Sequence, residues 1–138
     1  MASYEFELAP PPEPARDREL WLMHAAGLIL FEDVGKYARG EIAPGLDPVA
    51  RKAAEKAIDD ALYGLMMVID GVSGRLTNDE HQVTLGFSAK LESAPYAAPS
   101  EPTVLDLFDS DGMCMGFHQW REGDFGPDAV IRANGDRL

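Results

Sequence analysis

The apolar positions in the first third of the chain recur with the period of an α-helix. From Asp17 to Ala38 they follow steps of three and four residues, which gives one continuous stripe. Leu22, Ile29 and Leu30 lie off this stripe, toward the opposite face of the helix. A helix that is apolar on most of its surface is buried on more than one side. The pattern therefore predicts a homodimer with one or more of these three side chains near its interface.

A second helix is predicted between Asp47 and Gly71. Asp47 is typical of an N-cap, Pro48 of the first helical turn, and Gly71 of the residue that stops a helix. The small alanines on its apolar face permit close approach of a neighbouring helix. That face consists of Ala54, Ala57, Ile58, Ala61, Leu62, Leu65, Val68 and Ile69.

Alternation of apolar and polar residues predicts two strands before the C-terminal third. Tyr4, Phe6 and Leu8 alternate with glutamates and predict a short strand, within an extended N-terminal segment of residues 1–16. Residues 82–92 alternate without a fault and predict a longer strand. Each strand is expected to bury one face and expose the other.

The segment TVLDLFDSDGMCMGFHQW, residues 103–120, predicts a β-hairpin. Asp111-Gly112 near its centre is a strong hairpin-turn signal, because both residues tolerate positive φ. Both strand faces are largely apolar, which is typical of a hairpin covered on two sides. With the strand over residues 82–92, the hairpin forms a three-stranded antiparallel meander.

The order of these elements predicts an α+β fold in which two helices pack on a small antiparallel β-sheet. The sheet consists of the three-stranded C-terminal meander, either alone or with the N-terminal strand as a further member. Residues 93–102 are too rich in proline and alanine for regular structure, and we expect a mobile loop there. One short helical turn, capped by Asn134 and Gly135, is expected in the tail. The sequence shows no internal repeat and no convincing domain boundary, so we interpret residues 1–138 as a single domain.

The chain is strongly acidic. Twenty-four Asp and Glu against twelve Lys and Arg give a formal net charge of −12 and a pI near 4.5. Such a charge repels a nucleic-acid backbone and an anionic membrane surface, so we expect neither as a partner. A basic protein is the charge-compatible partner, and the simple solubility of a bacterial-type cytosolic protein is the other explanation.

The cysteine content and the N-terminus favour a cytoplasmic location. Cys114 has no second cysteine to pair with, which fits a reducing compartment. The opening sequence MASYEFELAPPPEPARDRE shows no basic region followed by an apolar stretch, so no secretory signal is expected. The longest apolar run, residues 21–31, already contains His24, and a membrane-spanning helix needs about 20 apolar residues.

No short motif of catalysis or cofactor binding occurs in the sequence. HExxH, CxxC, GxSxG, GxGxxG and Walker A patterns are all missing, and we expect no cofactor. His24, His81 and His118 fall on different elements, so the sequence gives no reason to expect a shared metal ion. The acidic turn before Gly112 lacks the ligand spacing of a calcium loop. Cys114 is expected to be an inert buried thiol.

Asp106 is the residue whose expected surroundings conflict most with its chemistry. The hairpin pattern places Val104, Phe108, Met115 and Phe117 on the same face. If that face is covered, ionisation of the carboxyl costs desolvation energy. The alternative is an aspartate on an edge strand, hydrated by water.

The segment FHQWREGDFG is the best place in the sequence to seek a binding site. Trp120 and Arg121 are residue types enriched in binding hot spots, and Glu122 and Asp124 lie beside them on a glycine-bracketed loop. The alternative for Trp120 is packing in the core or at its rim. The predicted binding residues are Asp106, His118, Trp120, Arg121, Glu122 and Asp124.

Two classes of function follow from these features. The first is a non-enzymatic protein-interaction module, a homo-oligomer that binds a basic partner in the manner of an immunity protein. That comparison is an analogy, since such proteins resemble this chain only in being small acidic α+β domains. The second is a small-molecule-binding protein or minor enzyme with a pocket between helices and sheet. The missing motifs favour the first class.

Overall fold

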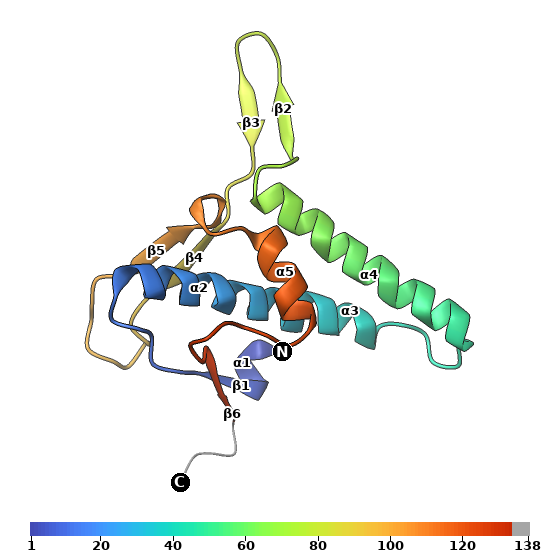
Figure 1. Cartoon of the computed structure of the whole chain (residues 1–138), viewed down its shortest axis with the longest axis horizontal. Helices are drawn as coiled ribbons and strands as arrows, with labels where there is room; N and C mark the ends of the chain where they lie inside the picture. Colours follow the sequence, from blue (N-terminus) through green and yellow to red (C-terminus); the bar gives the residue numbers. More distant parts are fainter. Residues whose placement is uncertain (134–138) are drawn as a thin grey trace.

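The computed structural model describes residues 1–133 and combines helices with small antiparallel sheets (Figure 1). This confirms the predicted α+β class. Residues 93–102, predicted to lack regular structure, contain neither helix nor strand. In chain order the elements are α1 (Ala2–Glu5), β1 (Phe6–Leu8), α2 (Ala15–Leu30), the π-helix η1 (Phe31–Lys36), α3 (Tyr37–Gly40), α4 (Pro48–Ile69), β2 (Arg75–Thr77), β3 (Gln82–Thr84), β4 (Ser88–Leu91), β5 (Thr103–Asp106), the 3₁₀-helix η2 (Leu107–Asp109), α5 (Met113–Arg121) and β6 (Ile131–Ala133).

The described strands form separate antiparallel pairs, and the predicted three-stranded meander is wrong. β1 pairs with β6, β2 with β3, and β4 with β5. β1 confirms part of the N-terminal strand, with Leu8 opposite Ile131, whereas Tyr4 lies in the helical turn α1 instead of in the extended segment expected there. β6 lies where a helical turn was expected, and its β-branched residue Ile131, opposite Leu8, favours a strand beside β1. Asn134 and Gly135, the expected cap of that turn, lie outside the described residues.

The first predicted helix is confirmed and lies at the centre of the fold. α2 continues through η1 into α3, so helical backbone extends from Ala15 to Gly40. It packs against α5 and against both β4 and β5 (Figure 1). The chain itself therefore covers several faces of this helix, although Ile29 stays 51% exposed. The buried residues are Trp21, Leu22, Met23, His24, Ala25, Gly27 and Leu28.

The second predicted helix, α4, is confirmed at both ends. Asp47 caps its first turn by accepting a hydrogen bond from the N–H of Ala50 at 2.9 Å. Gly71 follows its last turn with a φ of +73°, which glycine adopts without steric cost. Ala57 and Ala61 of the predicted apolar face are exposed, because only the C-terminal half of α4 enters the core. The buried residues are Leu62, Met66 and Ile69.

The predicted hairpin over residues 103–120 is wrong in its second half, which forms the helix α5. The residues after Gly112 satisfy a helical period as well as a strand period, and tertiary packing selects the helix. One side of α5 is buried and the other is exposed. The buried residues are Met113, Gly116, Phe117 and Trp120, at steps of three, one and three positions.

A long-range contact fixes the start of α5. The carboxylate of Asp70, just after α4, accepts hydrogen bonds from the N–H groups of Met113 and Cys114, each at 2.8 Å. These donors have no partner within the helix, and a negative charge beside them also interacts favourably with the helix dipole. Because Asp70 lies 43 residues before Met113, a local turn signal does not reveal this cap.

The predicted strand over residues 82–92 is interrupted and contributes to two sheets. β3 pairs with β2 in a hairpin that projects away from the body of the protein (Figure 1). Every residue of these two strands is exposed, so Val83 does not face a core as the alternation predicts. β4 follows the break and packs Ala89 and Leu91 against the core.

Among the described residues, most buried side chains belong to a hydrophobic core cluster to which α2, α4, α5 and β5 all contribute. Trp21 and Trp120 are its largest members, each 2% exposed. Within residues 1–133, no helix is both long enough and apolar enough to cross a membrane.

Candidate binding cleft

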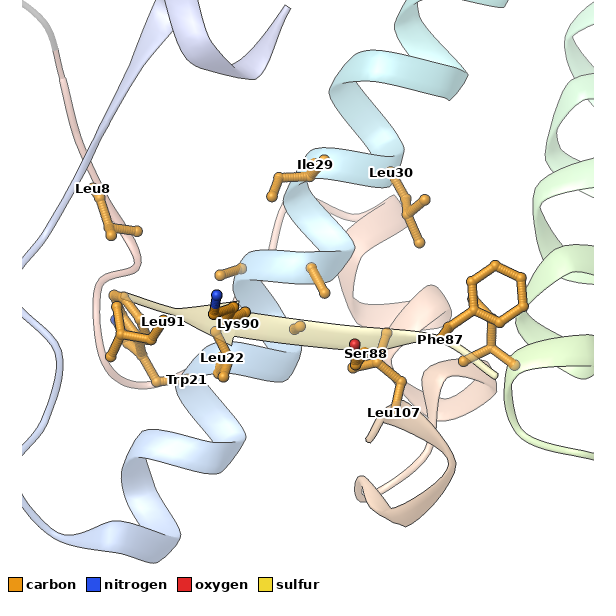
Figure 2. A pocket seen from close by; sticks show the side chains of 14 residues that line it. Leu8, Trp21, Leu22, Ile29, Leu30, Phe87, Ser88, Lys90, Leu91 and Leu107 are labelled. Carbon is orange, nitrogen blue, oxygen red and sulfur yellow. The ribbon is translucent and has the colours of Figure 1, made fainter. Parts of the chain in front are cut away.

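A cleft of about 390 Å³ lies between α2 and β4 (Figure 2). This volume is within the range of sites that hold small ligands or the side chains of a partner. Leu8 of β1 lies at one end of the cleft and Phe87 at the other, with Ile29 and Leu30 of α2 along one side. The lining is completed mainly by Leu22, Ala25 and Ala26 of α2 and by Ala89 and Leu91 of β4.

Small side chains keep this cleft open. Ala25 and Ala26 lie on α2 where larger side chains would fill the space beside β4. Ser88 and Lys90 are the polar lining residues, and both are exposed while the other two residues of β4 are half-buried. The Lys90 ammonium lies 2.7 Å from a carboxylate oxygen of Glu92. The interior of the cleft is therefore apolar.

A second apolar pocket, of about 280 Å³, continues this surface along α2. It shares Leu8, Ala25 and Ile29 with the α2–β4 cleft and reaches Phe6 and Val130 beside the β1–β6 pair. The shared lining residues therefore join the two pockets into one apolar surface beside α2.

A polar cavity of about 510 Å³ lies where α2 meets α5 and the loop that follows it. His24 forms part of its wall, and Nδ1 of His24 accepts a hydrogen bond from Nε1–H of Trp120 at 2.8 Å. Burial lowers the pKa of His24, while the carboxylates of Asp124 and Asp111 act in the opposite direction. The neutral ring carries its proton on Nε2, so it is a hydrogen-bond donor there rather than a general base.

The loop after α5 covers the ring of His24. Gly126 has a φ of +96°, and a Cβ at this position would lie 2.7 Å from Nε2 of His24, so only glycine fits. The carboxylate of Asp124 accepts a hydrogen bond from the Gly126 N–H at 3.0 Å, which stabilises this turn. Asp111, on the other side of the cavity, pairs with Arg16 at 2.5 Å. Both carboxylates therefore have partners within the protein.

Of the predicted binding residues, Asp124 lines this polar cavity and Trp120 contacts His24 in its wall, whereas Glu122 does not line it. Trp120 is buried and contacts His24, so its indole belongs to the core. Asp124 is exposed and borders the cavity. Glu122 is exposed and occupies the C-cap position of α5.

Two further predicted residues lie on the side of α5 that faces α4. The imidazole of His118 is exposed, with its centroid 5.6 Å from that of the Tyr63 ring. The guanidinium of Arg121 is 3.6 Å from the carboxylate of Asp59, which also pairs with Arg39. These contacts link α5 and α3 to α4, and neither His118 nor Arg121 lines the α2–β4 cleft.

Asp106 is the last residue of β5 and lines neither the α2–β4 cleft nor the polar cavity. It is exposed, and its carboxylate accepts a hydrogen bond from the N–H of Phe108 at 3.0 Å, which caps the 3₁₀-helix η2. Val104 and Phe108 beside it are 60% and 61% exposed. The covered apolar face expected around Asp106 is therefore wrong, because the strand that was to complete it is the helix α5.

The thiol of Cys114 is half-buried on α5. Burial raises its pKa, and the nearby carboxylate of Asp70 raises it further. A thiol that is protonated at neutral pH is a poor nucleophile. Among the described residues, no three His, Cys, Asp or Glu side chains are grouped as ligands for a metal ion.

The sequence contains one local signal for the cleft, a pair of alanines, that hydrophobic periodicity does not reveal. Ala25 and Ala26 are small side chains within a run of mostly large apolar residues, and they lie where α2 passes β4. No local signal pairs His24 with Trp120, because 96 positions separate them.

Comparisons of the chain with family models, with curated proteins and with solved structures found no match.

Proposed function

We propose that this chain is a non-enzymatic interaction module whose α2–β4 cleft binds an apolar segment of a basic protein partner. The observation that carries the proposal is the cleft, about 390 Å³ of open space with an apolar lining. A recess of this kind on a protein surface is typical of a binding site. Leu8 and Ile29, 53% and 51% exposed, extend the apolar surface to the rim.

The charge of the chain supports a basic partner. A net charge of −12 attracts and orients a cationic protein during encounter. Glu7 and Asp33 place carboxylates beside the pocket that adjoins the cleft. Added salt screens such attraction, so binding is expected to weaken as ionic strength rises.

The chemistry of the cleft supports binding rather than catalysis. Among the residues that line it, Ser88 and Lys90 have the only polar side chains, and both lie at exposed positions of β4. Nucleophilic catalysis needs a nucleophile and a base within hydrogen-bond distance of each other. The lining residues include no such pair.

A homodimer through the same surface is the second candidate. Ile29, predicted at a subunit interface, is half exposed at the rim of the cleft, and Leu30 is half-buried beside it. Leu22 is buried by its own chain. Two copies that each carry −12 repel one another, so the charge favours a basic partner over a second copy. Light scattering at micromolar concentration distinguishes the two assemblies.

Filling the cleft tests the proposal. We expect Ala26→Phe to occupy the space beside β4 and to lower binding of the neutral apolar dye Nile red by at least about tenfold. Ala61→Phe, on the exposed side of α4, is the matched control and should leave dye binding unchanged. If Ala26→Phe does not fold, Ile29→Asp at the rim replaces it. Equal dye binding by the wild type and the cleft variant would contradict the proposal.

A further inference from the structure

The edge of β4 that borders the cleft is unpaired. In the described chain β4 pairs with β5 alone. Figure 2 shows Leu107, which follows β5, on one side of β4, with Ile29 and Leu30 on the opposite side. Five consecutive residues, 87–91, line the cleft. Because side chains alternate along a strand, lining by consecutive residues indicates that the backbone edge itself faces the cleft.

The hydrogen bonds of the β4–β5 pair identify which backbone groups are free. The N–H of Leu107 donates to the carbonyl of Phe87 at 2.9 Å, so these two residues form a hydrogen-bonded pair. Bonded and non-bonded pairs alternate along an antiparallel ladder. With the observed register, Ala89 bonds to β5, whereas Ser88 and Lys90 direct their N–H and C=O groups away from it. These groups face the cleft.

We propose that the occupant of the cleft is an extended segment of the basic partner, which adds to β4 as a further strand. This inference rests on the proposed function and names the mode of binding. An added strand satisfies the free N–H and C=O groups of Ser88 and Lys90. A helix uses its own backbone groups internally and would leave these four groups without protein partners.

The surroundings of the edge define the chemistry of this segment. Side chains of an added strand point alternately toward α2 and toward solvent. Those that face Ala25 and Ala26 enter an apolar space, so they are aliphatic. The flanking residues are basic, because the chain carries −12 and the charge of Lys90 is already paired with Glu92.

A synthetic peptide tests strand addition. The probe is a fluorescent nine-residue peptide with two lysines at each end and three valines that alternate with two threonines between them. We expect saturable binding to the wild type that the Ala26→Phe substitution abolishes. Two methylated versions of the peptide are compared. One is N-methylated at the two threonines and the other at two of the valines, so the two versions are blocked on opposite backbone edges. Because only one edge of the peptide donates hydrogen bonds to β4, one of these peptides should bind at least about tenfold more weakly, and the other nearly as the unmethylated peptide does.

A pair of variants tests the same mode from the protein side. Lys90→Pro removes an N–H that β5 does not use, so the β4–β5 pair is retained while the edge is blocked. Val104→Pro removes the corresponding outward N–H of β5, outside the cleft lining, and is the matched control. We expect Lys90→Pro to lose peptide binding by at least about tenfold and Val104→Pro to bind the peptide as the wild type does.

Each outcome separates the mode of binding from the proposed function. Equal affinity of the two methylated peptides, or full peptide binding by Lys90→Pro, would overturn strand addition. If Lys90→Pro does not fold, the methylated peptides on the wild type decide. If strand addition is overturned, loss of Nile red binding in Ala26→Phe would still support the cleft as the binding site. A symmetric dimer that forms through β4 and excludes the peptide would also overturn the inference, in favour of a second copy as the occupant.

Discussion

The indole N–H of Trp120 donates a hydrogen bond to Nδ1 of His24 at 2.8 Å, across 96 positions of the sequence. The two residues are only 2% and 4% exposed. The bond requires an unprotonated Nδ1, so it selects the neutral form of His24. It joins α2 to α5 beneath the loop that contains Gly126.

We expect His24 to make the stability of the fold pH-dependent. Burial lowers its pKa, so the unfolded chain binds a proton more readily than the folded chain, and the free energy of unfolding decreases as pH falls below about 6.5. His24→Asn retains an acceptor near the position of Nδ1 but does not titrate. Urea melts at pH 7.5 and pH 5.5 should show a loss in the wild type that exceeds the loss in the variant by up to about 1.4 kcal/mol per pH unit. The same pH dependence in both proteins would contradict this role of His24.

Two glycines permit Trp120 to lie between α2 and α5. A Cβ on Gly27 would lie 2.5 Å from Cδ2 of Trp120, and one on Gly116 would overlap the same ring. We therefore expect Gly27→Ala to lower the free energy of unfolding by about 1–3 kcal/mol, as overpacked cores do. Gly64 of α4 has no atom within 4 Å of such a Cβ, so Gly64→Ala should stabilise the protein by up to about 1 kcal/mol. Denaturant melts should give opposite signs, and a shared sign would refute the packing argument.

The cap that Asp70 provides for α5 is testable in the same way. Asp70→Asn retains the shape of the side chain but removes its charge and one of two acceptors for the N–H groups of Met113 and Cys114. We expect a loss of about 1–2 kcal/mol in the free energy of unfolding. Asp79→Asn, exposed in the loop between β2 and β3, is the matched control and should change stability by less than about 0.5 kcal/mol. Equal effects of the two substitutions would show that Asp70 does not act as a cap.

The long helices were predictable because their signals are local. The helical period from Asp17 onward and the Asp47-Pro48 start lie within a few residues of the structure they specify. The apolar character of several faces of α2 also correctly indicated burial on more than one side. The period alone does not tell whether a second subunit or the same chain provides the cover.

The C-terminal half was mispredicted where distant contacts decide between two local solutions. Residues 113–121 fit a strand and a helix equally well by pattern, and Asp70 together with the core selects the helix. Likewise, β3 and β4 belong to different sheets, because β3 pairs with β2, which precedes it in the sequence, and β4 pairs with β5, which follows it. The cleft follows from this arrangement. None of the six predicted binding residues lines it, whereas Ala26 and Lys90 do.

Amide hydrogen exchange along β4 tests the central claim, that a free strand edge borders an apolar cleft. In the absence of a partner, the amides of Ser88 and Lys90 should exchange at least about tenfold faster than those of Ala89 and Leu91, which bond to β5. Addition of the valine–threonine peptide should protect Ser88 and Lys90 selectively. Uniform protection of the four amides in the free protein, or no change on addition of saturating peptide, would contradict the account.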